Sequence, residues 1–599
     1  MKVVLVAVHQ LSGYSVELQR CLGVLVLASA LRENGIECEV LDFTKLSLFE
    51  EGNRELVLKE AIDIIAAARP DVLGLSSMSN NLVIAIDICR QVKRHNPKIH
   101  TIIGGPGASS PARDILMTFP DVDAIIRGEA DVALLEYVKE LQILNFSPMI
   151  KGLVHRNSDT IIDNGWPEPI EDLDTTPIPF YELCKRNNGT NPVTMHLEVG
   201  RGCPYGCVFC STSVYFRRKY RVKSVERVLH ELSEIRSHFG DAIVIFNHDL
   251  LTHDRNYTIR LCEALEKLDP QIEWGASVRF DTIDPEILSI MNRAGCKNLF
   301  LGIEAATQRL QQIINKKLNL EILDTALECL VELEFNFTVA FIVGFPEETD
   351  ADMRSLWRLA FKIKQRARNN VIIQIHSLSP EPGSKIFDEW KSKLHYDDYG
   401  SPGHSDFPPL AWKRIRHIIK KYPVIFPIYN HIELPPERRI SSLKHSFLGR
   451  AFQGFTTHSM IQAYKLLGEP FLESLVDRLD ELELPPPEGE TLRYLGLMRS
   501  LRIMILDLLE GNNLPTDKYD TIAQTELALL EVIGRKDESF SRVVYTKYDP
   551  IRLMNILEGK QEEVELEERF RYTNFFWSQE LDTVKTAEIP ESLAMILMS

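Results

Sequence analysis

The chain has 599 residues, of which 85 are acidic and 68 are basic, so its formal net charge is −17. At about 100–200 residues per domain this length predicts roughly three to five domains, and an acidic chain without a long Lys/Arg run is not expected to bind nucleic acid, because phosphate contacts supply most of that affinity. The longest nearly uncharged apolar run, Cys21–Leu31, is shorter than the roughly 20 residues of a transmembrane helix, and the apolar segment after Met1 is too short for a signal peptide, so we predict no membrane span and a cytoplasmic location.

Residues 1–145 alternate strand and helix signals, which predicts an α/β domain with a parallel sheet covered by helices on both faces. The expected strands are Val3–Val8, Glu37–Leu41, Asp71–Ser76, His100–Ile103 and Asp123–Arg127. The expected helices are Leu22–Asn34, Glu60–Ala68, Leu82–His95 and one that begins at Val132. Ligands of such sheets bind outside the carboxyl ends of the strands, so the polar or glycine-rich stretches 76–81, 104–109 and 127–129 are expected to face one crevice.

The rest of the chain divides into three parts. Residues 146–190, with prolines and acidic residues between Trp166 and Pro179, are expected to form an irregular connector. Residues 191–395 repeat the strand–helix alternation and predict a partial (β/α)6 barrel. Its expected strands are Thr194–Val199, Ala242–Asn247, Ile272–Val278, Asn298–Ile303, Phe337–Val343 and Val371–Ser377. Residues 396–599 are expected to form a mainly helical domain, with helices at Trp412–Lys421, Ser459–Leu467, Phe471–Leu482, Thr491–Glu510 and Asp520–Ile533 and a late strand at Ser541–Thr546.

Three of the ten cysteines, Cys203, Cys207 and Cys210, follow the first strand of this second series. Their loop lies at the carboxyl end of a barrel, where active sites form. Three thiolates at this spacing can hold three corners of one 4Fe–4S cluster, which usually takes four cysteines, so one iron stays open to a substrate or cofactor. Gly202 and Gly206 are expected to give the backbone room to bend around the cluster. The alternatives are a structural zinc site, which would need a fourth Cys or His nearby, and chance clustering.

The cysteine segment, in this position, resembles the radical S-adenosylmethionine (SAM) superfamily, and the resemblance covers about residues 193–390. Phe209 fits the family's aromatic residue before the last cysteine. The resemblance implies that Cys203, Cys207 and Cys210 hold the 4Fe–4S cluster and that SAM binds the open iron. It further implies SAM contacts at the later strand ends, namely the methionine amine at Asn247, His248 and Asp249, the ribose and carboxylate at Ser277 and Arg279, an acidic contact at Glu304 and the adenine at Gly344.

Other interpretations of these residues remain open. Asp249 is alternatively a helix cap, Glu304 a salt-bridged acid of the barrel, and His248 and His253 surface histidines. The basic run 217–223 is either a solvated surface or a binding site for the carboxylate of SAM or of a substrate.

The first domain resembles the Rossmann-like cobalamin-binding domain of cobalamin-dependent radical SAM enzymes, and the resemblance then covers about residues 1–390. It rests on Leu22–Leu25, Gly104-Gly105, Arg127-Gly128-Glu129 and the connector segment Asp172–Pro177. It implies that cobalamin contacts the strand ends at Ser76, Ser77, Met78, Ser79, Gly104, Gly105, Gly107, Gly128 and Glu129.

The chain departs from many cobalamin proteins in lacking the DxHxxG loop that supplies a histidine to cobalt, and His9 is wrongly spaced to replace it. Within the resembling family the lower face of cobalt is often left without a protein ligand, so Met78 or Asn80 is expected to face the cobalt. The alternative is a domain that kept the fold and lost the cofactor.

The resemblance implies a methyltransferase in which SAM cleavage at the cluster activates an unreactive carbon and methylcobalamin delivers the methyl group. The substrate is expected to be a small metabolite or a peptide, and an external flavodoxin- or ferredoxin-type protein is expected to supply electrons. The C-terminal domain is expected to act as a lid that selects the substrate. Alternatives are a rearrangement or cyclisation without net methylation, and a non-catalytic cobalamin- or redox-sensing binding protein. A tRNA methylthiotransferase is disfavoured, because the chain is acidic and lacks a second cysteine set.

Overall fold

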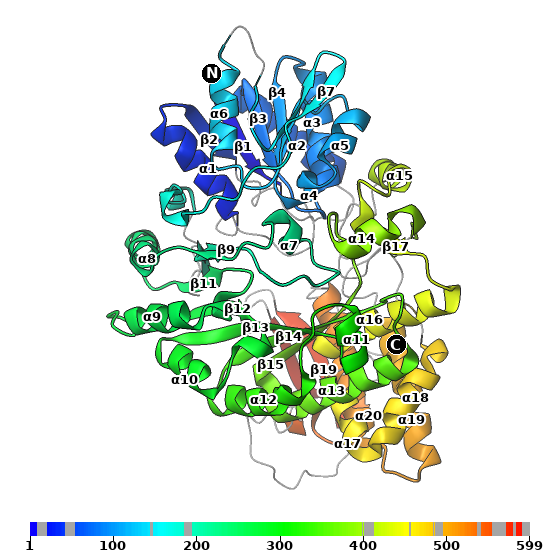
Figure 1. Ribbon diagram of the computed structural model, residues 1–599. Helices are drawn as coiled ribbons and strands as arrows, with labels where there is room; N and C mark the ends of the chain where they lie inside the picture. Colours follow the sequence, from blue (N-terminus) through cyan, green and yellow to red (C-terminus); the bar gives the residue numbers. More distant parts are fainter. Residues whose placement is uncertain are drawn as a thin grey trace. The chain divides into compact units, whose positions relative to one another are not determined.

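Figure 1 shows a computed structural model of the chain, which divides into two compact units. The first unit contains residues 1–301, 314–317 and 379–433, and the second contains residues 302–313, 318–378 and 434–599. The structure describes residues 1–8, 21–41, 54–143, 148–184, 194–397, 399, 413–454, 457–482, 484, 495–535, 541–550, 552–553, 571–578 and 583–589.

The first unit begins with a seven-stranded sheet in the order β2-β1-β3-β4-β5-β6-β7. Its strands are β1 (Lys2–Ala7), β2 (Glu37–Leu41), β3 (Val72–Ser76), β4 (His100–Gly104), β5 (Ala124–Ile126), β6 (Leu153–Asn157) and β7 (Thr160–Asp163). Its helices are α1 (Leu22–Glu33), α2 (Arg54–Ala68), α3 (Leu82–His95), α4 (Pro106–Ser109), α5 (Ala112–Thr118) and α6 (Ala133–Glu140). In Figure 1 α1 and α6 cover one face of the sheet, and α2, α3 and α5 cover the other. The predicted strands and helices of this domain are confirmed to within a few residues, except that α2 begins six residues before the predicted helix, at Arg54.

The prediction of an irregular connector is wrong for residues 153–163, and the sheet is mixed rather than fully parallel. β6 pairs antiparallel with β5, and β7 pairs antiparallel with β6. Leu153 and Val154 are fully buried, and the turn between the two strands contains Ser158 at φ 50°. Burial of this apolar pair against the edge of the sheet outweighs the polar character of the segment. The remainder of the connector holds two single-turn 3₁₀ helices, η3 (Leu173–Thr175) and η4 (Tyr181–Leu183).

The second sheet has the order β15-β14-β13-β12-β11-β8, which confirms all six predicted strands. They are β8 (Thr194–Glu198), β11 (Ile243–Asn247), β12 (Trp274–Val278), β13 (Cys296–Glu304), β14 (Asn336–Val343) and β15 (Val371–Ser377). Parallel ladders join β8 to β11, β11 to β12, β12 to β13 and β14 to β15. The helices of this region are α7 (Thr212–Tyr215), α8 (Val225–Phe239), α9 (Arg255–Leu265), α10 (Pro285–Arg293), α11 (Gln308–Ile313), α12 (Leu323–Glu332), α13 (Asp350–Ala367) and α14 (Lys385–Trp390). The boundary between the two units falls within β13.

Side-chain caps fix where several of these helices begin. The side chain of Ser224 accepts a hydrogen bond from the Arg227 backbone N–H at the start of α8, and Asp254 and Asp284 do the same for α9 and α10. Each cap satisfies an N–H that the first helical turn leaves without a partner. The strand-to-helix turns are therefore specified locally, which holds the strand ends in place.

Residues 379–433 lie in the first unit, so the predicted domain boundary at 396 differs from the observed one. Helix α15 (Lys413–Lys421) packs on α3, and its Ile415 and Ile419 are fully buried in the core of the first sheet. A two-stranded ribbon, β16 (Leu394–His395) with β17 (His431–Ile432), closes this segment. The apolar side of α15 finds its partner far back in the sequence, and no local pattern indicates that.

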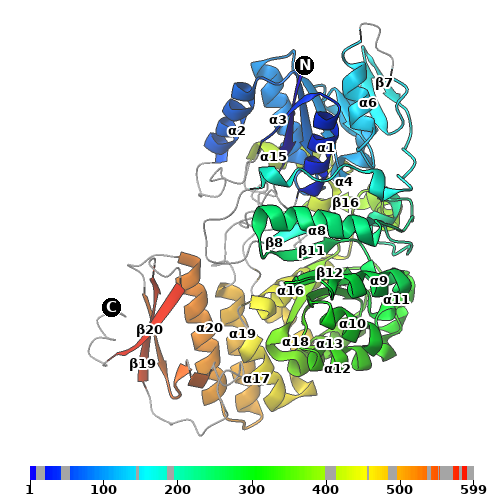
Figure 2. The same cartoon turned by 90° about the vertical axis from the view of Figure 1, so that its left-hand side faces the viewer.

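The rest of the second unit is helical with one small sheet. Its elements are α16 (Pro436–Gly454), α17 (Thr457–Leu467), α18 (Glu469–Asp477), α19 (Leu495–Gly511), α20 (Asp517–Arg535), β18 (Ser541–Thr546), β19 (Arg571–Ser578) and β20 (Thr583–Ile589). The predicted strand at 541–546 is confirmed, but it belongs to an antiparallel sheet of three strands that lies along α20 (Figure 2). The sequence analysis missed α16, because Ser442, His445 and Ser446 occupy buried positions where a helix normally shows apolar residues.

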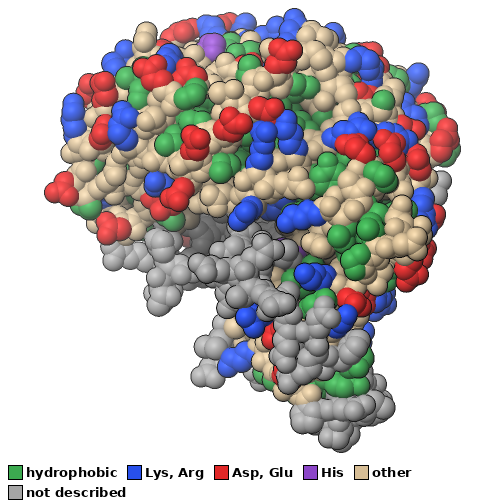
Figure 3. All heavy atoms as spheres, turned by 90° about the horizontal axis from the view of Figure 1, so that it is seen from below, with side chains coloured by type: hydrophobic (Ala, Val, Ile, Leu, Met, Phe, Trp, Pro, Cys, Tyr) green, Lys and Arg blue, Asp and Glu red, His purple; other side chains and the backbone are tan. Residues whose placement is uncertain are grey.

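Among the described helices, none has both the length and the apolar character that crossing a bilayer requires. Figure 3 shows Lys and Arg side chains interspersed with Asp and Glu on the face seen from below. Ion pairs within the second unit include Arg354 with Glu473 and Asp477, and Arg358 with Glu469.

Candidate cofactor sites

The cysteine loop is enclosed by a short antiparallel ribbon directly after β8. β9 (Gly200–Arg201) pairs with β10 (Arg221–Val222), and the segment between them, residues 202–220, carries all three cysteines. We call residues 200–222 the cluster hairpin. Gly202 has φ 89°, and the Lys219 carbonyl oxygen occupies the place where a Cβ atom of residue 202 would lie. Gly202 therefore closes the hairpin, whereas it was predicted to give the backbone room around the cluster.

The three thiols lie close enough to influence one another electrostatically. Burial raises the pKa of Cys203 to about 11, and the nearby Cys210, Asp249 and Cys207 add to this rise. Burial also raises the pKa of Cys210. No three Cys, His, Asp or Glu side chains in the described part of the chain are placed to hold a single metal ion.

Backbone contacts from distant segments hold the cysteine loop open. The Val208 N–H donates to the Ile314 carbonyl at 3.0 Å, and the Ile386 N–H donates to the Val208 carbonyl at 2.9 Å. The Asn315 side-chain amide donates to the Gly206 carbonyl at 2.7 Å. All three cysteines and Phe209 remain partly accessible to solvent. The loop is held both by these distant segments and by the hydrogen bond from the Cys210 N–H to the Cys207 carbonyl at 3.2 Å.

Arg279, a predicted SAM contact at the end of β12, faces the cysteine loop. Its guanidinium lies 3.9 Å from the centre of the Tyr205 ring, and its Nη1 is 4.0 Å from the Cys207 sulfur. Asp281 binds it through two hydrogen bonds of 2.8 and 2.7 Å, and it also donates to the Lys316 carbonyl. A fixed cation beside a thiol favours the thiolate, which is the form that binds iron. Sequence analysis did not single out Tyr205, although it lies between the first two cysteines.

The residues at the end of β11 have different surroundings. The Asn247 side-chain oxygen accepts a 2.9 Å hydrogen bond from Nδ1 of His196 in β8. Asp249 is exposed, and its carboxylate accepts the Gly202 N–H at 2.9 Å. Asp249 therefore ties the strand end to the cluster hairpin, so the helix-cap alternative is wrong. Ser277 of β12 stays partly accessible.

His248 is buried, so neither the surface interpretation nor direct access to a cofactor fits it. Its ring packs against Gly200 and lies 4.7 Å from the Tyr220 ring, and its Nδ1 accepts the Leu250 N–H at 2.8 Å. Burial lowers the pKa of His248 to about 3, so the ring is neutral. His253 is exposed, as the surface interpretation predicted.

Glu304 and Gly344 lie at strand ends of the second unit. Glu304 ends β13 at φ 67°, a left-handed conformation that costs a non-glycine residue roughly 1–2 kcal/mol. Gly344 follows β14 at φ 95°, and its N–H donates to the Glu348 carboxyl at 2.5 Å. Burial raises the pKa of Glu348 to about 8. Ser442 of α16 fills the space where a Cβ atom of residue 344 would lie, 2.6 Å away.

The glycines at the end of β4 are packed against the chain itself. A Cβ atom at Gly105 would lie 2.5 Å from the Ser77 carbonyl oxygen, and one at Gly107 would overlap the Met78 backbone. The expectation that both leave room for a flat ligand therefore does not match their surroundings. Gly104 differs, because its nearest neighbour is the Ile126 carbonyl oxygen at 3.6 Å.

The other residues predicted to contact cobalamin differ in their exposure to solvent. Met78 is 50% exposed, whereas Asn80 is buried, so of the two candidates to face cobalt only Met78 is presented to solvent. Ser76, Ser79, Gly104 and Gly105 are partly accessible, and Ser77, Gly107, Gly128 and Glu129 are buried. His9 lies outside the described residues. The Ser79 hydroxyl donates to Glu381, at the carboxyl end of β15, at 2.7 Å.

The basic run 217–223 is not purely solvated, because Arg221 and Lys223 are buried in ion pairs. Its members pair with acidic side chains of the connector, the first domain and α8, namely Arg217 with Glu168, Lys219 with Glu171, Arg221 with Glu129 and Lys223 with Glu231. The sequence holds a signal for this pairing, because the basic run and the acidic connector carry opposite charges.

Two family models match the chain. The model described as the radical SAM superfamily matches residues 197–360, and the model described as the B12-binding domain matches residues 20–138. Residues 197–360 thus form a radical SAM domain, and residues 20–138 form a B12-binding domain. The first match begins within β8 and contains the cysteine loop, and the second contains the ends of β3 and β4.

Curated relatives of this chain include two with different names. An uncharacterized methyltransferase of Pyrococcus horikoshii is 27% identical over 373 residues, which are 61% of this chain and 77% of the relative. An anaerobic magnesium-protoporphyrin IX monomethyl ester cyclase of Cereibacter sphaeroides is 25% identical over 341 residues, which are 55% of each chain. The chain thus spans only about half the length of the cyclase.

Among solved structures, the radical SAM methyltransferase TsrM of Kitasatospora setae, with cobalamin and a [4Fe–4S] cluster bound, superposes with a TM-score of 0.56. The superposition covers 80% of this chain and 99% of TsrM at 14% sequence identity. At this identity the likeness concerns the fold, and it extends over the cobalamin-binding and radical SAM domains together.

The residues at both candidate sites fit the cofactors that these domains imply. Cys203, Cys207 and Cys210 lie on one loop and offer three sulfur donors, which suits a cluster with one open iron. At the first sheet the accessible side chains at the ends of β3 and β4 are small or apolar, which suits contact with a large ring system. Glu129 does not belong to this set, because it is buried in ion pairs with arginines.

Proposed function

We propose that this radical SAM protein is a cobalamin-dependent methyltransferase that transfers a methyl group to carbon of a small metabolite or a peptide. The observation that carries the proposal is that the cysteine loop and the ends of β3 and β4 belong to one compact unit. Tyr215 of the cluster hairpin donates through its hydroxyl to the Gly128 carbonyl of the cobalamin-binding domain at 2.7 Å. The cysteine loop and the cobalamin domain are thereby joined by direct contact, as transfer between two cofactors requires.

Each residue has a part in this proposal. The thiolates of Cys203, Cys207 and Cys210 would hold the cluster, and Arg279 would balance their charge. Asp249, at the end of β11, would orient the amino group of SAM. When bound, the cluster with SAM supplies one-electron cleavage chemistry, and methylcobalamin supplies the methyl group.

Position supports the remaining contacts. Ser277, at the end of β12, points to the same side of the sheet as Arg279 because alternate strand residues share a face. Asn247, Glu304 and Gly344 are candidate SAM contacts by their places at strand ends. For cobalamin we retain Ser76, Met78, Ser79, Gly104 and Gly105, which are accessible.

Substrate, electron donor and location are further parts of the proposal. TsrM has been solved with tryptophan as substrate, and the cyclase relative is named for a tetrapyrrole, so relatives of this fold act on metabolites of very different size. An external flavodoxin- or ferredoxin-type protein would deliver electrons to the cluster in the cytoplasm. The net charge of −17 supports a non-nucleic-acid substrate.

Anaerobic reconstitution with iron, sulfide and hydroxocobalamin tests the proposal without knowledge of the substrate. The wild-type protein should show absorption bands of both a 4Fe–4S cluster and bound cobalamin. With SAM and a strong reductant it should release 5′-deoxyadenosine, and cob(I)alamin on the protein should be converted to methylcobalamin. A protein that binds cobalamin but forms neither product is a sensor or binding protein, and the proposal fails.

A second candidate function is cyclisation or rearrangement without net methylation. The relative named as a cyclase supports it, because it is nearly as similar to this chain as the relative named as a methyltransferase. Product mass separates the two functions once a substrate is found. Isotopically labelled SAM methyl appears in the product of a methyltransferase and not in the product of a cyclase.

A further inference from the structure

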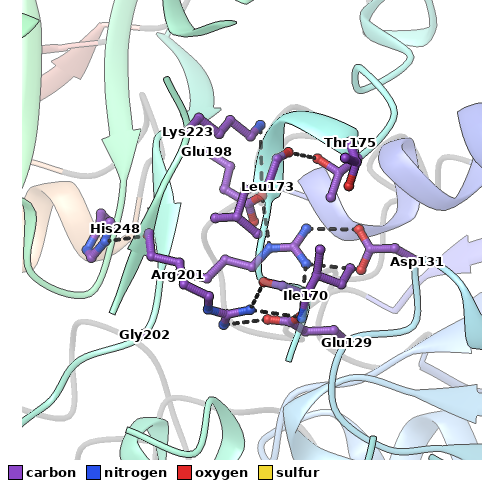
Figure 4. Close-up of polar contacts among 12 residues, drawn as sticks. Glu129, Asp131, Ile170, Leu173, Thr175, Glu198, Arg201, Gly202, Lys223 and His248 are labelled. Atoms are coloured by element: carbon purple, nitrogen blue, oxygen red, sulfur yellow. Dashed lines mark hydrogen bonds and ion pairs between the residues drawn. The ribbon is translucent and has the colours of Figure 1, made fainter. Parts of the chain in front are cut away.

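A buried network of charges joins the cluster hairpin to the cobalamin-binding domain. Arg221 binds Glu129 through two hydrogen bonds of 2.6 and 3.0 Å, and Arg201 binds Asp131 through two of 2.9 and 3.1 Å. Arg201 also lies 3.8 Å from Glu129. Figure 4 shows Glu129 and Asp131 facing the hairpin, with Arg201 between Asp131 and Glu198. We call these four residues, Arg201, Arg221, Glu129 and Asp131, the hairpin clamp.

The clamp is almost fully shielded from water. The four side chains are between 4% and 10% exposed. Although burial alone would raise it, the Arg201 guanidinium holds the pKa of Asp131 below its ordinary value. Paired arginine–carboxylate contacts of this kind fix orientation as well as distance, because two parallel hydrogen bonds define a plane.

Both arginines sit at the paired base of the cluster hairpin. Arg201 is opposite Arg221 in the β9–β10 register, and the three cysteines lie on the segment between them. On the other side, Glu129 and Asp131 follow β5 directly, at the carboxyl edge of the first sheet. The clamp therefore connects the strand end of one cofactor domain to the base of the loop that carries the other cofactor's ligands.

A second layer of contacts holds the clamp in place. Glu129 accepts the Ile170 N–H at 2.7 Å, and Arg221 donates to the Ile170 carbonyl at 2.6 Å. Two residues after Arg221, Lys223 pairs with Glu231 of α8 at 2.8 Å, and both side chains are buried. Hydrogen bonds and ion pairs thus join the connector at Ile170, α8 and the hairpin around the four clamp residues.

We infer that the hairpin clamp sets the distance and orientation between the cluster and cobalamin. Glu129 and Asp131 are positioning residues, not cofactor ligands, and they act through Arg221 and Arg201. The inference rests on the proposed function, because only a chain that binds both cofactors has a distance to set. Exposed ion pairs in the same hairpin are too weak and too mobile to do this.

The test compares two identical substitutions, each of which removes a carboxylate that pairs with an arginine of the cluster hairpin. Glu129→Gln breaks a pair that is buried, and Glu168→Gln breaks the pair with Arg217, whose side chains are 43% and 76% exposed. Each protein is reconstituted with iron, sulfide and hydroxocobalamin and reduced to contain cob(II)alamin and the paramagnetic cluster. The measured quantity is the enhancement of cob(II)alamin spin relaxation by the reduced cluster, with Cys207→Ala protein as the cluster-free reference.

We expect wild type and Glu168→Gln to give the same single value of the cob(II)alamin relaxation enhancement. Glu129→Gln should give a smaller enhancement, spread over a range of values. The rate of 5′-deoxyadenosine release should change much less, because the cysteine loop itself is intact. An unchanged enhancement in Glu129→Gln, or an equal change in both variants, would overturn the inference. If Glu129→Gln does not fold, by circular dichroism, Asp131→Asn decides by the same measurement.

Arg221→Lys gives a further check, since it keeps the charge but not the two parallel hydrogen bonds. The inference expects its enhancement to be dispersed as well, and a wild-type value would contradict it. If the wild-type protein shows no cob(II)alamin signal at all, the proposed function fails and the positioning role falls with it. That result is distinguishable from an unchanged enhancement in the variants.

Discussion

The ends of β8 and β4 both carry motifs that predict cofactor binding, yet they are built differently. At β8 the cysteines stay partly accessible, and distant backbone groups hold their loop open. At β4 the faces of Gly105 and Gly107 are filled by the backbone of residues 77–79. A set of spaced ligands indicates chemistry directly, because each side chain must reach one centre. Glycines indicate only a close approach, and the approaching group here is the chain's own loop.

Removal of a cluster ligand should have the largest effect. Cys207→Ala should abolish 5′-deoxyadenosine release from SAM and remove most of the iron–sulfur absorption, because a cluster held by two thiolates is not retained. Cys21→Ala is the matched control, since Cys21 is also partly buried but lies outside the cysteine loop. It should leave both measurements at the wild-type level. Full activity of reconstituted Cys207→Ala would show that the loop does not carry the cluster.

The β4 glycines should separate packing from cofactor contact. Gly107→Ala places a methyl group into the Met78 backbone, so it should destabilise the first domain by at least 2–3 kcal/mol, roughly the cost of overpacking, and lower its melting temperature. Gly104→Ala has ordinary contacts at 3.6 Å, so its stability should change by less than about 1 kcal/mol. Weaker binding of hydroxocobalamin by Gly104→Ala at unchanged stability would place the corrin at this strand end. Equal melting temperatures for the two variants would contradict the packing argument.

The end of β14 differs from the other two strand ends, because a buried acid, Glu348, lies near it, where β8 is followed by cysteines and β4 by glycines. Burial raises the pKa of Glu348 from 4.5 to about 8, so the folded protein binds a proton that the unfolded chain has lost. The free energy of unfolding should therefore fall as the pH rises from about 4.5 to 8, by at most 3–5 kcal/mol, on the order of 1.4 per unit of pKa shift. Glu348→Gln keeps an acceptor for the Gly344 N–H and should flatten this slope.

Denaturant unfolding of both proteins at several pH values measures the slope. Glu347→Gln, at the neighbouring position in sequence, is the control and should keep the wild-type pH dependence, because the Glu347 side chain is exposed to solvent. Parallel curves for wild type and Glu348→Gln would refute the assignment.

Sequence patterns predicted most strands of both large sheets because apolar runs and caps are local signals. Glu37–Leu41 and Val371–Ser377 have the predicted bounds, and the cysteine spacing predicted the family that the models match. Burial of a charged side chain was the property that sequence could not supply. Glu129 belongs to a cofactor motif in the sequence, but in the structure its carboxylate forms a buried ion pair with Arg221.

Packing partners that are distant in sequence explain the other elements that the sequence did not predict. α15 is amphipathic on its own, yet nothing nearby in the sequence shows that its isoleucines enter the core of the first domain. β6 and β7 extend a sheet whose edge is only defined once β5 is in place. α16 carries serine and histidine at buried positions, and their partners, such as Trp357 for His445, come from other elements.

Met78 gives the smallest expected effect and the sharpest view of the β3–β4 edge. It is 50% exposed beside packed glycines, so contact with cobalamin would bury the exposed half of its side chain. At 1.5–3 kcal/mol for burial of a whole methionine side chain, the contact contributes about 1 kcal/mol, and Met78→Ala should weaken hydroxocobalamin binding roughly fivefold. Met117→Ala, which removes a 62% exposed methionine of α5, should leave the affinity unchanged. Equal hydroxocobalamin affinities of the two variants would show that cobalamin does not contact the end of β3. A loss of affinity confined to Met78→Ala would mean that the packed glycines hold this loop against the corrin.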